Sequence, residues 1–358
     1  MRIYQGNGLG DFYYKLIRDI TKHGREIVIR GRRCMELTEP VTLVYNKPGY
    51  CWMNIPGRKF NPFFALAEVA WILMGNGSAE WIGYFNSRMM TFLDEGHSEL
   101  HGAYGVRLRR ISRYEGGKWV EPMDQIHEVV EKLRRDPTTR QAVMTLWDPV
   151  QDNSPSKDIP CNNVVYYSLR DGVLDQTVVI RSNDIVWGTP YNAIQFSHLQ
   201  ALVAGEVGAE IGTLTYVIQN LHYYFDEYKM TLATLLEQAH DEESEIKALS
   251  IPGFCPTTDA ELQALDSTLD MIKLNYRGPD VYNVDPRLHF GNGYWNQVIP
   301  QMIWIFTAIK EKTVPADKIF DRITMLGEPL IPLIFDFYRG SENVLVQEIW
   351  NAYYSIPR

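Results

Sequence analysis

A single cysteine in a polar setting is the first residue of this sequence that could do covalent chemistry. Cys161 lies in the segment IPCNN, directly before a run of residues typical of a β-strand. A thiolate can add reversibly to an electron-poor carbon, so Cys161 is a candidate nucleophile. An isolated cysteine is more often a small buried apolar residue. The hypothesis therefore depends on the polar residues that accompany it.

A dense group of polar residues follows the next strand-like run. It begins with Arg181, Ser182 and Asp184 and ends, after the segment WGTPY, with Asn192. A guanidinium beside a thiol stabilises the anion, so Arg181 would lower the pKa of Cys161 and favour its thiolate near pH 7. Two simpler interpretations stay open. The group could be an ordinary turn, and Asn192 could be the N-cap of the helix that the following residues predict.

Glu68 is an acidic residue within the otherwise apolar run 61–75. Burial of an ionised carboxylate is unfavourable and raises its pKa. A carboxyl group with a raised pKa is suited to relaying protons to a substrate and to water. The alternative is a core carboxyl group that only makes a structural hydrogen bond.

Three motifs, in this order along the chain, resemble the thymidylate synthase family. They are Pro160-Cys161, the pattern RSxDxxxGxPxN from Arg181 to Asn192, and the pattern HxY from His222 to Tyr224. Three earlier segments agree: the family's buried-glutamate helix with Glu68 and Trp71, its turn at Ala103-Tyr104-Gly105, and its dimer-crossing segment from Asp136 to Arg140. The resemblance covers about residues 25–228.

The resemblance implies a covalent reaction at a pyrimidine base. Cys161 would add to C6 of uracil and so make C5 nucleophilic, and the one-carbon donor would be 5,10-methylenetetrahydrofolate, with no metal. The residues that the resemblance assigns to catalysis are Cys161, Glu68, Tyr104, Asp184 and Asn162, and those that it assigns to the folate are Asp184, Trp71 and Met90.

The substrate phosphate requires permanently charged, fork-shaped partners, which arginine provides. By resemblance, Arg30, Arg181 and Ser182 would bind the 5'-phosphate, and Arg140 would reach it from the second subunit of a homodimer. Gln141 stands where the family often has a further arginine, which predicts weaker phosphate affinity. Arg30 could instead belong to a solvated basic turn.

The sugar and the base are assigned to three further residues. His222 and Tyr224 resemble the pair that binds the 3'-hydroxyl of a deoxyribose, although a tyrosine-rich strand is more often plain packing. The carboxamide of Asn192 can accept from uracil N3–H and donate to O4, whereas cytosine presents the opposite pair. The cytosine-specific relatives carry Asp at this position, so dUMP is the expected substrate.

Two reaction outcomes share every step up to an exocyclic methylene on C5: hydride gives dTMP, and water gives 5-hydroxymethyl-dUMP. At the family's spacing, Met90 replaces a shielding tryptophan and Asn162 replaces a histidine. The synthase tail that follows a DxxxEGYxPHP-like segment is not found, and the sequence closes with IWNAYYSIPR. A slimmer lid admits water more readily.

We therefore expect a dUMP hydroxymethylase similar to those of bacteriophages that replace thymine with 5-hydroxymethyluracil. A thymidylate synthase and a dCMP hydroxymethylase are the alternative enzymes. A catalytically silent nucleotide-binding scaffold is the alternative outside enzymes, and the combination of Cys161, Arg181, Asp184 and Asn192 disfavours it.

The elements that must position these residues predict an α+β fold. Strands are expected within 26–55 and at 142–147, 162–170, 174–182 and 213–224, and helices at 61–75, 123–135 and 192–205. By resemblance, the strands would form the family's mixed twisted sheet at a dimer interface. We expect a catalytic domain over residues 1–229 and a mainly helical extension over residues 230–358, whose role the sequence does not indicate.

The composition limits the class of protein. A net charge of -9 over 358 residues argues against general nucleic-acid binding, which depends on many Lys and Arg side chains. The first residues lack an apolar signal segment, no apolar run is long enough to span a bilayer, and four scattered cysteines do not suggest a disulfide framework. The expected location is a reducing cytoplasm, that of the host if the protein is viral.

Overall fold

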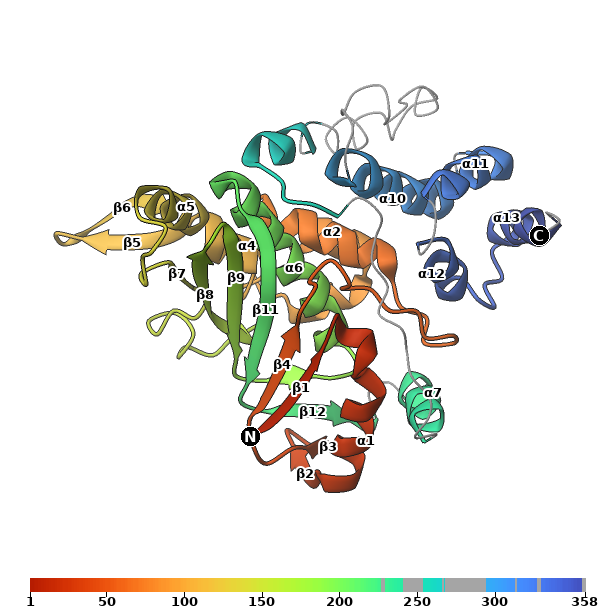
Figure 1. Ribbon diagram of the computed structural model, residues 1–358. Coiled ribbons are helices and arrows are strands. Elements are labelled where there is room, and N and C mark those ends of the chain that lie inside the picture. Colours follow the sequence, from red (N-terminus) through yellow and green to blue (C-terminus); the bar gives the residue numbers. More distant parts are fainter. Residues whose placement is uncertain are drawn as a thin grey trace.

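A mixed six-stranded sheet lies at the centre of the molecule (Figure 1). Its strand order is β1 (Arg2–Gly6), β4 (Val41–Tyr45), β11 (Glu210–Ile218), β9 (Val173–Ile180), β8 (Asn162–Arg170) and β7 (Val143–Thr145). β1 is parallel to β4 and β11 is parallel to β9, whereas the other neighbours are antiparallel. The computed structural model describes residues 1–226, 229–240, 254–265, 267, 294–312, 314–326 and 330–355.

A smaller sheet and a hairpin complete the β-structure. The smaller sheet has the order β10 (Asn183–Asp184), β12 (Leu221–Tyr224), β3 (Arg32–Glu36) and β2 (Arg25–Ile29), and the hairpin consists of β5 (Ile111–Glu115) and β6 (Lys118–Met123). A two-residue turn joins β2 to β3, with φ of 50° at Arg30 and 77° at Gly31. Positive φ at both positions gives the turn geometry that suits a tight hairpin.

Helices cover one face of the six-stranded sheet. Tyr216 of β11 packs edge-on against Phe196 of α6 (Gly188–Val207), and Tyr45 of β4 stacks on Phe12 beside α1 (Tyr13–His23). The remaining elements before residue 226 are η1 (Leu9–Asp11), α2 (Pro62–Leu73), α3 (Ala79–Phe85), η2 (Ser87–Phe92), α4 (Tyr104–Arg109) and α5 (Gln125–Arg135).

The opposite face of this sheet carries no described helix, and its side chains are only partly buried or exposed. Two rows of side chains cross the strands there, as the register of paired residues shows. One row is Val143, Tyr166, Thr177, Thr215, Val44 and Gln5, and the other is Thr145, Val164, Val179, Val217, Thr42 and Ile3. Most of these residues are β-branched or aromatic, as is typical of a face that packs against another surface.

Helix α2 is held on several sides, and it carries Glu68. Asn61 caps its N-terminus by accepting a hydrogen bond from Phe64 N at 2.9 Å, and Pro62 occupies the first turn, where its missing N–H has no cost. Every residue of Pro62–Leu73 is buried except Glu68, which is partly buried. The helix packs against α3, α4 and α6, and also against two helices from the C-terminal part of the chain.

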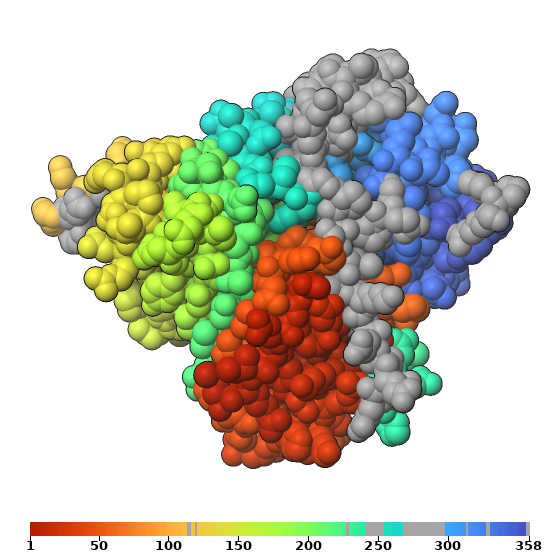
Figure 2. Space-filling model, viewed as in Figure 1, coloured from red at the N-terminus to blue at the C-terminus, as the bar shows by residue number. Residues whose placement is uncertain are grey.

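The C-terminal helices are α7 (Lys229–Ala239), α10 (Tyr294–Glu311), α11 (Ala316–Leu326), α12 (Leu330–Phe337) and α13 (Val344–Ser355). α10 and α12 pack on α2, and the Phe306 ring of α10 lies 5.4 Å from that of Phe63. In the space-filling view, this region forms the end of the molecule opposite to the β5–β6 hairpin (Figure 2). No helix among the described residues is both long enough and apolar enough to cross a membrane.

The expected α+β class is confirmed, and most predicted elements are present. The strand expected at 213–224 is in fact two strands, because the chain turns after Ile218 and enters the second sheet at Leu221. The predicted helical extension over residues 230–358 lies partly outside the described residues. The division at residue 229 stays a prediction.

Candidate active site

Cys161 and Arg181 meet where β8 begins and β9 ends. The Arg181 guanidinium donates to the carbonyl oxygens of Ile159 and Pro160, each at 2.9 Å, and its Nη2 lies 3.7 Å from Cys161 Sγ. The backbone N–H of Arg181 also donates to Cys161 O at 3.0 Å. The loop before the nucleophile therefore wraps around a guanidinium that faces the thiol.

Burial raises the pKa of the Cys161 thiol above its usual range, and the charge of Arg181 acts in the opposite direction. Asp158 and Asp184 add to the rise. The expectation that Arg181 makes the thiolate the favoured form is therefore wrong for the protein without substrate. Removing a thiolate from water costs more free energy here than one guanidinium restores.

A chain of amide side chains lies beside the nucleophile. Asn162 is fully buried, and its Nδ2 donates to Tyr104 OH at 2.8 Å and to Asn192 Oδ1 at 3.2 Å. Asn192 Nδ2 in turn donates to Asn183 Oδ1 at 3.3 Å. Asn162 Oδ1 is buried and has no hydrogen-bond partner among the described residues. These contacts fix the orientation of the Asn192 carboxamide.

Asn192 is not a helix cap. Helix α6 begins at Gly188, with Trp187 in the N-cap position, so Asn192 lies in the first turns of the helix. The N-cap interpretation was wrong because the segment before Asn192 is already helical. This position directs the carboxamide from a rigid element toward Asn162, the residue that follows Cys161.

Glu68 meets the same helix one turn further on. Gln195 lies three residues after Asn192, and its Nε2 donates a hydrogen bond to Glu68 Oε2. Burial raises the pKa of Glu68 to about 8; the Gln195 bond lowers it and the charge of Asp158 raises it. The carboxyl group is thus protonated at neutral pH. The hydrogen bond is also one that a purely structural carboxyl would make, so the role of Glu68 stays a prediction.

Asp184 and His222 lie on adjacent strands. β10 pairs in parallel with β12, which places Asp184 opposite His222. The His222 ring packs edge-on against Tyr224 with ring centroids 5.1 Å apart. Asp184 Oδ1 accepts from the backbone N–H groups of Val186 at 2.7 Å and Trp187 at 3.2 Å, which shapes the turn into α6.

The expected phosphate ligands are less closely grouped. Arg30 lies at the β2–β3 turn and Arg140 in the loop between α5 and β7. Both are exposed, and neither side chain has a hydrogen-bond or ion-pair partner among the described residues. Ser182 follows Arg181 directly and is partly buried. A solvated arginine has the same surroundings, so these phosphate roles stay predictions.

Met90 lies in η2, a segment that borders the Asp184 turn. Arg88 of this segment lies over the Trp187 ring at 5.4 Å. Met90 is 43% exposed and packs on Gly83, where an added Cβ would lie 2.8 Å from the Met90 Sδ. Trp71, by contrast, is buried and donates through Nε1 to Ser78 O at 3.1 Å. The folate roles of Met90 and Trp71 stay predictions.

Two residues of the site were not singled out from the sequence. Gln195 follows Asn192 at a spacing that places both on one helix face, so its signal was present once the helix was expected. Asn183 lies between two motif residues, and only the tertiary structure shows that its Oδ1 accepts from Asn192. Among the described residues, no group of three or more His, Cys, Asp or Glu side chains is arranged to hold a metal ion.

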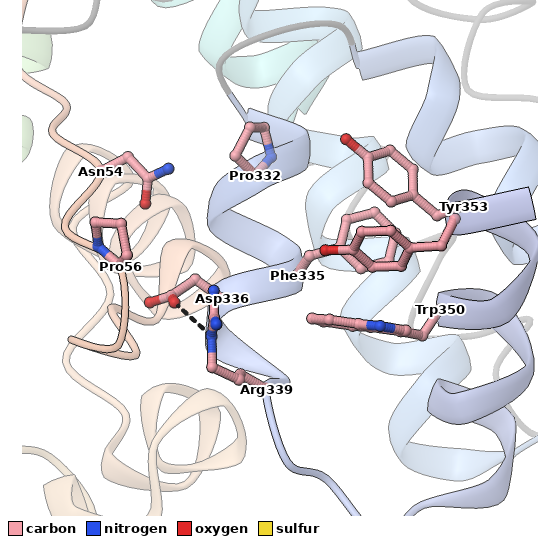
Figure 3. A pocket seen from close by; sticks show the side chains of 9 residues that line it. Asn54, Pro56, Pro332, Phe335, Asp336, Arg339, Trp350 and Tyr353 are labelled. Atoms are coloured by element: carbon pink, nitrogen blue, oxygen red, sulfur yellow. Dashed lines mark hydrogen bonds and ion pairs between the residues drawn. The ribbon is translucent and has the colours of Figure 1, made fainter. Parts of the chain in front are cut away.

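A separate cavity of about 220 Å³ lies at the C-terminal helices (Figure 3). It is lined by Asn54, Pro56, Pro332, Phe335, Asp336, Arg339, Trp350, Tyr353 and Tyr354. None of the site residues above borders it, and its volume is below the roughly 300–1,000 Å³ of typical ligand pockets. We assign it no part in catalysis.

Comparison with known proteins identifies relatives over most of the chain. A family model described as thymidylate synthase matches residues 11–268. A deoxyuridylate hydroxymethyltransferase of Bacillus phage SP01 is 35% identical over 232 residues, which cover 64% of this chain and 60% of that protein. One of Pseudomonas phage M6 is 38% identical over 189 residues, covering 52% and 51%.

A third relative is named for a different activity. A putative thymidylate synthase of Methanosarcina acetivorans is 28% identical over 230 residues, covering 64% of this chain and 92% of that protein. The chain spans about half the length of the phage relatives that it matches, with matched shares of 60% and 51%.

Proposed function

Because the chain belongs to the thymidylate synthase family, we propose that it converts dUMP and 5,10-methylenetetrahydrofolate to 5-hydroxymethyl-dUMP and tetrahydrofolate. The observation that carries the proposal is the oriented Asn192 carboxamide beside Cys161, together with a half-exposed methionine at the border of the site. Two phage relatives that bear the name deoxyuridylate hydroxymethyltransferase support it.

The reaction begins with addition of the Cys161 sulfur to C6 of the base. The thiol must first lose its proton, and the adjacent Arg181 guanidinium stabilises the anion as it forms. C5 then carries the negative charge of an enolate and can attack the one-carbon unit; loss of the C5 proton with departure of tetrahydrofolate would leave an exocyclic methylene on C5. The folate supplies that unit when it is bound.

Asn192 would select uracil. Its Oδ1 already accepts from Asn162, and its Nδ2 already donates to Asn183. A carboxamide has a second lone pair and a second N–H, which can pair with N3–H and O4 of uracil. Rotation of the amide to suit cytosine would reverse both protein contacts. This arrangement supports dUMP over dCMP.

Glu68 would supply a proton near O4. A protonated carboxyl group can donate directly or through water as negative charge develops on the carbonyl oxygen. Asp184 is partly exposed, and its carboxylate suits the N–H groups of a pterin ring. These residues therefore fit a folate, with Met90 and Trp71 as the further proposed contacts.

Water would add to the exocyclic methylene in the last step, because the side chain at the border of the site, Met90, is slim. Met90 is flexible and slim, and it stands where the family's synthases place a tryptophan. An exocyclic methylene that no indole shields can be attacked by water before hydride reaches it. The product is then 5-hydroxymethyl-dUMP.

A homodimer would complete the site. The uncovered face of the six-stranded sheet presents Tyr166, which is 45% exposed, between rows of β-branched residues. A second copy of this face would bury the rows, and Arg140 from that copy would reach the phosphate. Arg140 is exposed and has no partner in the described part of its own chain, so it could extend to a second subunit.

The product decides between the candidates. Incubation with dUMP and 5,10-methylenetetrahydrofolate should give 5-hydroxymethyl-dUMP, identified by mass, without the rise in absorbance at 340 nm that accompanies dihydrofolate. Formation of dTMP together with that rise would identify a thymidylate synthase instead. Faster turnover of dCMP than of dUMP would overturn the assignment of Asn192.

A further inference from the structure

Asp158 is a carboxylate of the site that the steps above leave without a role. It lies three residues before Cys161, in the loop that the Arg181 guanidinium holds. Its Oδ2 accepts a hydrogen bond from Gly102 N at 2.8 Å, two residues before Tyr104. The carboxylate is therefore fixed between the loop of the nucleophile and the turn that carries Tyr104.

The charge of Asp158 reaches three residues of the site. It raises the pKa of Cys161, of Tyr104 and of Glu68. The carboxylate thus lies within electrostatic range of the nucleophile and of both proton-carrying groups. Burial also raises the pKa of Asp158 itself, which brings it closer to the range in which a general base works at neutral pH.

One oxygen of Asp158 is available to a water molecule. Oδ2 accepts from Gly102 N, whereas Oδ1 accepts no hydrogen bond from any residue that the structure describes. The side chain is only partly buried, so it keeps contact with solvent. A carboxylate oxygen can hold a water molecule and take its proton.

The Asp158 loop is tied to the segment that follows Met90. Asp94 accepts from Ser156 Oγ at 2.6 Å and from Lys157 N at 3.0 Å, and Lys157 Nζ donates to Leu93 O at 2.9 Å. The segment after Met90, where water is proposed to enter, is therefore hydrogen-bonded to the loop that carries Asp158 Oδ1. These bonds place the loop that carries Asp158 next to the segment that directly follows Met90.

From these contacts we infer that Asp158 is the general base for the water that adds to the exocyclic methylene. The inference rests on the proposed hydroxymethylase activity. The water oxygen bonds to the methylene carbon, one water proton passes to Asp158, and the electron pair of the methylene double bond moves onto C4–O4 as an enolate. Collapse of the enolate restores C5=C6 and expels the Cys161 thiolate. The proton on Asp158 then returns to solvent.

The test compares Asp158→Asn with Asp158→Glu and with Asp171→Asn, a matched change at an exposed turn between β8 and β9. Release of tritium from [5-³H]dUMP reports the steps before water, and 5-hydroxymethyl-dUMP reports the water step. Asp158→Asn should lower hydroxymethyl product on the order of a hundredfold, tritium release much less, and Asp158→Glu should recover part of the loss. Added 2-mercaptoethanol should trap the methylene as a thioether in Asp158→Asn.

Separate outcomes test the inference and the activity on which it depends. A wild-type protein that makes dTMP would overturn both. With a hydroxymethyl product from the wild type, an unchanged rate in Asp158→Asn would overturn the base. An equal fall in tritium release and in product would also overturn the role as a base, because it would place the effect of Asp158 before the water step. Loss of the covalent complex with 5-fluoro-dUMP and methylenetetrahydrofolate would overturn it too, because Asp158 would then act before the water step or only in the fold.

Discussion

Burial raises the pKa of the Cys161 thiol, and the Arg181 guanidinium lowers it. We predict that Cys161→Ser abolishes turnover by a factor on the order of 10⁴ or more, because an alcohol at this position cannot form the C6 adduct. The measurement is product formation from dUMP under single-turnover conditions. Cys255→Ser, at an exposed cysteine, should leave the rate unchanged; surviving activity in Cys161→Ser would contradict the covalent mechanism.

The raised pKa of Glu68 predicts that the stability of the protein depends on pH. Its pKa is raised from 4.5 to about 8 by burial, so the folded protein binds a proton that the unfolded chain loses between these values. The free energy of unfolding should therefore fall as pH rises through this window, by a few kcal/mol at most. Chemical denaturation at pH 5 and pH 8 measures the slope.

Glu68→Gln should flatten that slope, because the amide cannot ionise. Glu80→Gln, at an exposed residue of α3, should keep the wild-type slope. A slope that persists in Glu68→Gln would show that Glu68 titrates normally in the folded protein, and that the proposed proton donor is ionised at neutral pH.

The site was predictable from the sequence to the extent that its residues lie in ordered motifs. Cys161 and Arg181 were expected to meet, and they do. The protonation of the thiol was not predictable, since it depends on how much of the surrounding protein excludes water. Gln195 and Asp158 form hydrogen bonds with residues distant in the sequence, so spacing alone did not indicate their partners.

At the scale of elements, one carboxylate joins the C-terminal helices to the entry of α2. Asp336 of α12 accepts from Gly57 N at 2.7 Å and Lys59 N at 2.9 Å, and it pairs with Arg339 at 3.1 Å (Figure 3). We predict that Asp336→Ala lowers the free energy of unfolding by about 1–3 kcal/mol, because two backbone N–H groups lose their acceptor. Urea denaturation measures the loss.

The control for Asp336 is Asp321→Ala on α11, where the side chain is exposed and makes no described contact. Its effect should stay within about 0.5 kcal/mol. If Asp336→Ala is equally mild, the bonds to Gly57 and Lys59 contribute little to the attachment of the C-terminal helices.

The elements differ in how far they were predictable. α2 follows from a local signal, an Asn-Pro start and an apolar run, and it lies where expected. The missed strand β1 buries only Tyr4 among its residues, so its sequence has weak alternation. The chain turns between β11 and β12 at Gln219 and Asn220, and the Asn220 side chain donates to Glu36 Oε2 at 2.6 Å. A contact with such a distant residue leaves no periodic signal in the sequence.

At the scale of the whole molecule, the proposed dimer makes each site depend on two chains. We predict that Arg140→Ala and Cys161→Ser are each inactive alone and regain activity when mixed and allowed to exchange subunits. A mixed dimer would contain one site with its own Cys161 and an intact Arg140 from the partner. The rate of product formation before and after exchange measures the recovery.

The uncovered face of the six-stranded sheet allows a second test of the dimer. Tyr166→Asp should convert the dimer to a monomer in analytical ultracentrifugation, because a carboxylate would be buried without a partner. Val150→Asp, at a loop residue that is 80% exposed, is the control and should leave the mass unchanged. A monomeric wild type, or no recovery on mixing, would contradict a site shared between chains.

The packing of α2 also has a consequence for synthesis on the ribosome. Its apolar surface is covered partly by α10 and α12, which are translated more than two hundred residues later. At roughly 5–20 residues per second, the nascent helix waits on the order of ten seconds or longer for these partners. During that interval an uncovered apolar helix is a natural target for chaperones, so the yield of folded protein in a cell should depend on their supply.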